Sequence, residues 1–225
     1  MELEATQNKL KNGYDSLLLS YAAGTLDMAQ NLIVESHLTF SNEARSFVRK
    51  YEMIGGALIE NECESVDMSI GSLDNVLARL DSQNSRKQKE RSDFTHSEIH
   101  FDIPAPLKNR LNAQKRVGWK PLMPGFKAYD IDLECKKSTA RFMQVAPGTK
   151  SPHHSHGGME ITLVLDGAFT DETGDYKIGD MIVTDDTIEH SPVACKMDGC
   201  TCLVVSTAPI KLSGIASLLN PFLKP

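Results

Sequence analysis

The pattern of apolar residues changes once along this chain, and that change constrains its fold more than any other feature. In the first third the apolar side chains recur at helical spacing, for example in the segment ARSFVRKY. In the second half they gather in short β-prone segments separated by Gly, Pro and Asp. The stretch QNSRKQKERSD between them is dense in charge and lacks large apolar side chains. We therefore predict an α + β chain of two domains, with a small helical bundle at 1–82, a charged linker at 83–103 and a β-sandwich or barrel at 104–225.

Four short helices are expected in the first third. The sequence predicts a helix over residues 17–23 capped by Asp15, a second one capped by Asp27 and a third one capped by Ser41. Gly55-Gly56 is expected to end the third helix, because glycine favours the left-handed backbone of a helix terminus. A fourth helix follows Ser72. Their apolar stripes indicate a small bundle, or a bundle that a partner completes.

Charge and composition exclude several classes of protein. Residues 1–85 hold thirteen acidic and six basic side chains, which disfavours direct binding of nucleic acid and suits a basic protein partner or a solvated surface. No apolar run approaches the roughly 18 residues of a membrane span, and the polar N-terminus does not resemble a secretion signal. The five cysteines are irregularly spaced, which is typical of a reducing compartment. We therefore expect a cytoplasmic protein without membrane contact.

A histidine cluster predicts a metal site in the second half of the chain. In an extended strand His154 and His156 share one face, because side chains two residues apart point the same way. Glu160 can return to that face as a third ligand, and His190 can reach it from a neighbouring strand. Three imidazoles and one carboxylate suit one divalent ion, with Zn²⁺ favoured and Fe²⁺, Mn²⁺ or Ni²⁺ as alternatives. His153 is out of phase and is expected to face solvent or to support a ligand.

The spacing of these residues resembles the first cupin motif throughout. That motif runs here as Gly148, five residues, His154-x-His156, three residues, Glu160, six residues and Gly167. The resemblance implies a double-stranded β-helix, or jelly-roll barrel, for the second half. The second cupin motif is kept at Gly179 and His190, but Asp185 and Thr187 stand where proline and glycine are expected. This departure concerns the turn just before His190.

The whole chain resembles the ChrR-like anti-sigma factors. The resemblance is carried by LLLSYAAGTLDMAQNLIVESHL and RKYEMIGGALIE in the first third and by MEITLVLDGAFTDETGDYKIGD and IEHSPVA in the second half. It implies a helical domain that occludes an extracytoplasmic-function sigma factor and a cupin domain that senses oxidative stress. A regulator with no catalytic residues is therefore expected.

The chain departs from this family at the helical zinc site. Such proteins carry a His-x-x-x-Cys-x-x-Cys run and a further histidine near the N-terminus. Here His37 is kept, but Ser41 and Ala44 stand in the cysteine positions and Asn12 stands near the place of the extra histidine. Because structural zinc needs four strong donors, no zinc is expected in the helical domain. Apolar contacts such as those of Phe40 and Phe47 are expected to stabilise it instead.

Two functions from different classes remain open. In the first, the chain is an anti-sigma factor, and an oxidant or a small ligand acts at the cupin metal and changes the arrangement of the domains about the linker. In the second, the chain is a metal-dependent cupin enzyme, a dioxygenase or an isomerase of a small molecule, with the helices reduced to docking or dimerisation. Cys200 and Cys202 share a strand face, so a redox role stands beside plain core packing. A homodimer is compatible with either function.

Overall fold

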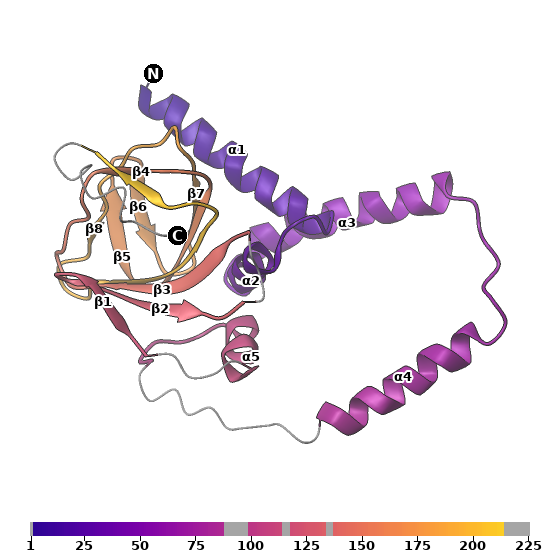
Figure 1. Cartoon of the computed structure of the whole chain (residues 1–225). Coiled ribbons are helices and arrows are strands. Elements are labelled where there is room, and N and C mark those ends of the chain that lie inside the picture. Colours follow the sequence, from indigo (N-terminus) through magenta and orange to yellow (C-terminus); the bar gives the residue numbers. More distant parts are fainter. Residues whose placement is uncertain (1, 88–98, 114–117, 134–136, 214–225) are drawn as a thin grey trace.

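The computed structural model describes residues 2–87, 99–113, 118–133 and 137–213. Helices come first and antiparallel strands follow, as the change in periodicity predicted (Figure 1). The helices are α1 (Glu2–Ala22), α2 (Met28–His37), α3 (Asn42–Glu62), α4 (Ser72–Lys87) and α5 (Ala105–Ala113). Among the described residues, no helix combines the length and the apolar character that crossing a bilayer requires.

The predicted starts of α2 and α3 are confirmed. The Asp27 side chain accepts hydrogen bonds from the backbone N–H groups of Ala29 and Gln30. The Gln30 side chain in turn accepts from the backbone N–H of Asp27, which completes a capping box. Ser41 accepts from the N–H of Ala44 and so starts α3. The prediction that α3 ends at Gly55-Gly56 is wrong, because the helix continues to Glu62. The segment ALIENE after the glycines consists mostly of good helix formers, which offset a glycine cost of about 1 kcal/mol each.

Three further helical expectations need correction. The first helix is a single element of 21 residues rather than the short segment 17–23. Residues 83–87, expected to open the linker, are the last residues of α4, and 88–98 lie outside the described residues. Helix α5 was not expected. It buries Leu107 and Leu111 completely, and this pair at i and i+4 was the available signal.

The strands form a curled antiparallel sheet whose long strand β5 (Glu160–Asp171) serves two sets of partners (Figure 1). Its first half pairs with β7 and β9, and its second half pairs with β6 and β8, with a register shift between Val164 and Asp166. The other strands are β1 (Lys120–Met123), β2 (Phe126–Ile131), β3 (Thr139–Val145), β4 (His154–His156), β6 (Gly174–Lys177), β7 (Met181–Thr184), β8 (Val193–Ala194), β9 (Cys200–Ser206) and β10 (Ile210–Leu212). Strand β10 pairs with β4.

Helices and sheet share one apolar core. Helix α1 packs on β7, and α2 packs on β5, β9 and α5. One cluster joins Leu18 of α1 and Ile33 of α2 to Ile161 and Leu203 of the sheet. A second cluster, around Val164 and Cys202, fills the inside of the barrel and receives Leu10 of α1. The helices therefore pack on the sheet as well as on one another, and the linker is not their only connection to the barrel. The division at residues 82 and 104 stays a prediction.

Candidate metal centre and the altered helical site

Three of the four predicted ligands lie together. His154 and His156 both point inward from β4, because residues two apart share a face of a strand. His190 joins them through an antiparallel bridge in which the backbones of His154 and His190 exchange two hydrogen bonds of 3.0 Å. One ring nitrogen of each histidine lies within 4.8 Å of the other two. All three side chains are buried. Two separate segments of the chain thus bring the three imidazoles together.

Hydrogen bonds orient two of the three rings. The Nδ1 of His154 lies 2.8 Å from the carbonyl oxygen of Pro152, and the Nδ1 of His190 lies 2.7 Å from Oδ2 of Asp171. Because these oxygens only accept, both Nδ1 atoms carry a proton and donate it. The Nε2 of His190 faces the Nε2 of His156 at 3.2 Å. Two imidazole nitrogens that face each other in this way can bind one cation between them.

Glu160 lies beside this cluster rather than within it. Its Oε2 accepts a hydrogen bond of 3.0 Å from Ser206 and is 3.5 Å from Nδ1 of His156. In the described part of the chain, that Nδ1 is the buried side-chain nitrogen without a hydrogen-bond partner. The role of Glu160 as fourth ligand therefore stays a prediction.

The protonation states suit a cation. Burial, together with the neighbouring His190 and His156, lowers the pKa of His154 to about 4, so its ring is neutral at pH 7. Burial opposes ionisation of Glu160, but the His156 ring and the Ser206 hydroxyl outweigh it and lower the pKa of that carboxyl. The pKa of Asp171 is lowered in the same sense, because hydrogen bonds from His190 and Thr173 outweigh its burial. The neutral imidazole of His154 beside ionised carboxylates suits a divalent ion.

The turn before His190 keeps its shape without the expected proline and glycine. Oδ1 of Asp185 accepts from the backbone N–H of Thr187 at 2.9 Å and from its hydroxyl at 2.6 Å. An aspartate that bonds to the backbone two residues on mimics a backbone turn. The two residues that depart from the cupin motif thus replace it with a turn of their own.

The altered helical site is closed by hydrogen bonds. The ring of His37 is buried, with Nδ1 donating to the carbonyl oxygen of Gly179 at 3.0 Å and Nε2 accepting from the hydroxyl of Tyr14 at 2.8 Å. His37 therefore joins α1 and α2 to the turn before β7. The side chain of Ser41 caps α3, and Ala44 is buried in the core. Tyr14 was not foreseen, although it lies on the same helix as Asn12.

Other predicted side chains occupy ordinary places. Asn12 and Phe40 are exposed, and Phe47 packs against Tyr51 with ring centroids 4.7 Å apart. His153 faces solvent, which is one of the two positions expected for it. The Sγ atoms of Cys200 and Cys202 are 3.4 Å apart inside the barrel, where the contact with Cys200 and burial raise the pKa of the Cys202 thiol.

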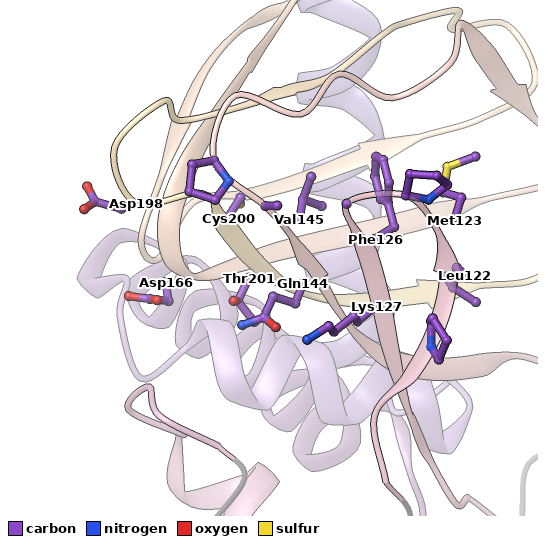
Figure 2. Close-up of a pocket in the computed structure, with 15 residues that line it drawn as sticks. Leu122, Met123, Phe126, Lys127, Gln144, Val145, Asp166, Asp198, Cys200 and Thr201 are labelled. Atoms are coloured by element: carbon purple, nitrogen blue, oxygen red, sulfur yellow. The ribbon is translucent and has the colours of Figure 1, made fainter.

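A cavity of about 770 Å³ lies at another part of the barrel. It is lined by the β1–β2 hairpin, the end of β3 and the start of β9. Figure 2 shows Gln144, Lys127 and Thr201 on one side of it, with Val145 and Phe126 on the other. None of the four predicted metal ligands is among its lining residues.

Comparison with known proteins confirms the family resemblance. Residues 108–209 match the family model described as the ChrR Cupin-like domain. Anti-sigma-E factor ChrR of Cereibacter sphaeroides is 35% identical over 212 residues, which are 93% of this chain and 96% of that protein. The crystal structure of Rhodobacter sphaeroides SigE in complex with the anti-sigma ChrR contains a chain that is 35% identical, with a TM-score of 0.68 over 85% of this chain and 96% of that one. This chain therefore belongs to the ChrR-like family of anti-sigma factors.

Proposed function

We propose that this protein sequesters an extracytoplasmic-function sigma factor through the apolar stripes of α3 and α4. The observation that carries the proposal is the exposure of these stripes. Met53 and Ile59 on α3 are 75% and 65% exposed, and Leu73 on α4 is 66% exposed. Exposed apolar stripes of this kind mark a site of protein association. Six further side chains of this region are exposed in the same way: Ile54, Leu58, Ile70, Val76, Leu77 and Leu80.

The charge of residues 1–85 and the similarity to ChrR support a sigma factor as the protein that covers these stripes. The acidic excess of residues 1–85, which include α3 and most of α4, favours a basic protein surface. The ChrR relative was crystallised with SigE, and its chain aligns with this one over 96% of its length. An amphipathic helix whose apolar face lacks a partner gains its stability when that face is covered. We place the protein in the cytoplasm, where such a partner is found.

Binding of purified sigma factors of the source organism, measured by calorimetry, tests this function. We expect one sigma factor to bind, with the replacement Leu77→Asp on α4 weakening binding at least tenfold, since a buried Leu contributes about 1.5–3 kcal/mol. The matched control is Met197→Asp, because Met197 is equally apolar and 82% exposed but lies in the barrel. Equal loss in both variants, or no binding by the wild type, would refute the proposed surface.

The barrel is proposed to hold one divalent metal ion, with zinc favoured, through His154, His156 and His190, together with Glu160. The orphaned Nδ1 of His156 and the facing Nε2 atoms support this assignment. A bound ion there supplies a positive charge that fixes the three imidazoles. Because the rings are buried, the site suits a structural or sensing ion better than one that must admit a substrate. We propose that oxidative stress acts on this site and thereby on sigma release.

The helical domain is proposed to hold no zinc. Both ring nitrogens of His37 are engaged, Ser41 is used as a cap and Ala44 offers no donor. Elemental analysis of the full-length protein tests both metal assignments. We expect one ion per chain, which His154→Ala removes and His37→Ala leaves in place. A second equivalent that disappears with His37→Ala would show that the helices bind metal.

A further inference from the structure

The third histidine is held differently from the other two. His154 and His156 lie on β4 within one backbone ladder, whereas His190 follows a loop that lacks the proline and glycine of the cupin motif. A ligand on such a loop needs side-chain contacts to fix its ring. The contacts come from the hairpin turn between β5 and β6, which is 19 residues away in sequence.

Asp171 at the end of β5 is the centre of these contacts, and its side chain is fully buried. One carboxylate oxygen, Oδ1, accepts from the backbone N–H and the hydroxyl of Thr173 at 2.8 and 2.6 Å and from the N–H of Gly174 at 3.2 Å. The other oxygen, Oδ2, accepts from Nδ1 of His190 at 2.7 Å. The turn thus fixes one oxygen, and the second is directed at the imidazole.

The next residue of the turn binds the backbone of the same loop. Oε2 of Glu172 accepts a hydrogen bond of 2.8 Å from the N–H of Ser191. Thr173 itself is fixed by the hydroxyl of Tyr176 at 2.6 Å, and the Tyr176 ring stacks on Phe169. Two consecutive acidic residues therefore bind the side chain of one loop residue and the backbone of the next. An ordinary hairpin turn needs neither contact.

We propose that Asp171 is a positioning residue for the metal centre, which fixes His190 in the tautomer that carries its proton on Nδ1. The role rests on the proposed metal site. With the proton on Nδ1, the lone pair of Nε2 points at His156 and His154 and is free to bind a cation. Neither cupin motif contains Asp171, so the chain supplies this support through its β5–β6 turn.

The test compares Asp171→Asn with the wild-type protein in full length. Asparagine has almost the same volume, and its oxygen can keep the bonds to Thr173 and Gly174. Its amide then points N–H at the N–H of His190, which disfavours the Nδ1-protonated tautomer. Nitrogen NMR of the metal-free proteins should show the His190 proton on Nδ1 in the wild type and on Nε2 in the variant. Zinc affinity, measured by competition with a chromophoric chelator, should fall about 10–100-fold.

The control is Thr173→Val, which removes one hydrogen bond to Asp171 without touching the bond to His190. This variant should keep the wild-type tautomer and zinc affinity even if its thermal midpoint falls. Unchanged tautomer and unchanged zinc affinity in Asp171→Asn would overturn the role of Asp171 while the metal site stands. A wild-type protein that takes up no zinc would instead overturn the proposed metal site.

Discussion

Replacing His37, the single histidine of residues 1–82, by alanine should lower the stability of the protein. The ring is 4% exposed and makes two hydrogen bonds that join α1, α2 and the turn at Gly179. Each such bond contributes about 1 kcal/mol net, and the Tyr14 hydroxyl and the Gly179 carbonyl lose their partner when the ring is removed. With the lost packing, the free energy of unfolding should fall by about 3 kcal/mol. That corresponds to a thermal midpoint roughly 6–12 °C lower for a chain of this size.

Urea unfolding measures this loss with two probes. Far-ultraviolet circular dichroism follows mainly the helices, and fluorescence of the single tryptophan, Trp119, follows the barrel. Because helices and sheet share a core, the two transitions should coincide in the wild type. In His37→Ala both transitions should therefore move to lower urea together.

Two further variants make the reasoning refutable. His100→Ala removes an exposed histidine and should change the free energy of unfolding by less than about 0.5 kcal/mol. Tyr14→Phe combined with His37→Ala in a double-mutant cycle should give a coupling energy near 1 kcal/mol for the Tyr14–His37 bond. If His37→Ala is no less stable than His100→Ala, the hydrogen-bonded link is not a source of stability.

Three other outcomes are expected. His154→Ala should lose the bound metal, measured by elemental analysis, and keep its affinity for the sigma factor; loss of sigma binding would contradict the separation of the two surfaces. Asp185→Ala should lower the free energy of unfolding by about 1 kcal/mol and weaken zinc binding, because the turn before His190 loses both hydrogen bonds to Asp185. The control Asp186→Ala, at an exposed neighbour, should change neither the stability nor the zinc affinity. The folded-state pKa of His154, about 4, lies below the unfolded value near 6.5, so the unfolded chain binds the extra proton first. Metal-free protein should therefore lose up to about 3 kcal/mol as the pH falls from 6.5 to 4, and urea titrations showing equal stability across that range would refute the shift.

Much of the fold was predictable because local signals agree with the final structure. The capping residues Asp27 and Ser41 start their helices, and the change to β-prone segments marks the barrel. Helix lengths were less predictable, since α3 continues through Gly55-Gly56 where tertiary context and good helix formers outweigh the glycine preference.

The packing of helices on the sheet could not be predicted from periodicity. Apolar stripes show that a face needs cover, but they do not identify the covering element. Leu17 and Ile33 are covered by the barrel, whereas Leu73 and Leu77 on α4 remain exposed, although all four belong to similar stripes.

The two-residue period of a strand was enough to predict part of the metal centre. The spacing of His154 and His156 fixes their common face, and the motif places His190 near them. The supporting residues were not predictable, because Asp171 and Tyr14 act through contacts between segments distant in sequence. The segment ETGD at 172–175 has the composition of a turn, but the sequence does not show that the loop of His190 lies against it.

The common core of helices and sheet limits how this protein can be recombined with others. The outer sheet face that carries Ile161, Leu163 and Phe142 is covered by α1, α2 and α5. A chimera that joins residues 1–87 to an unrelated sensor would leave the apolar face of the helices that packs on this sheet without cover. Such a chimera should be insoluble unless the recipient barrel carries the same apolar outer face. The helical segment therefore cannot be transferred to another protein on its own.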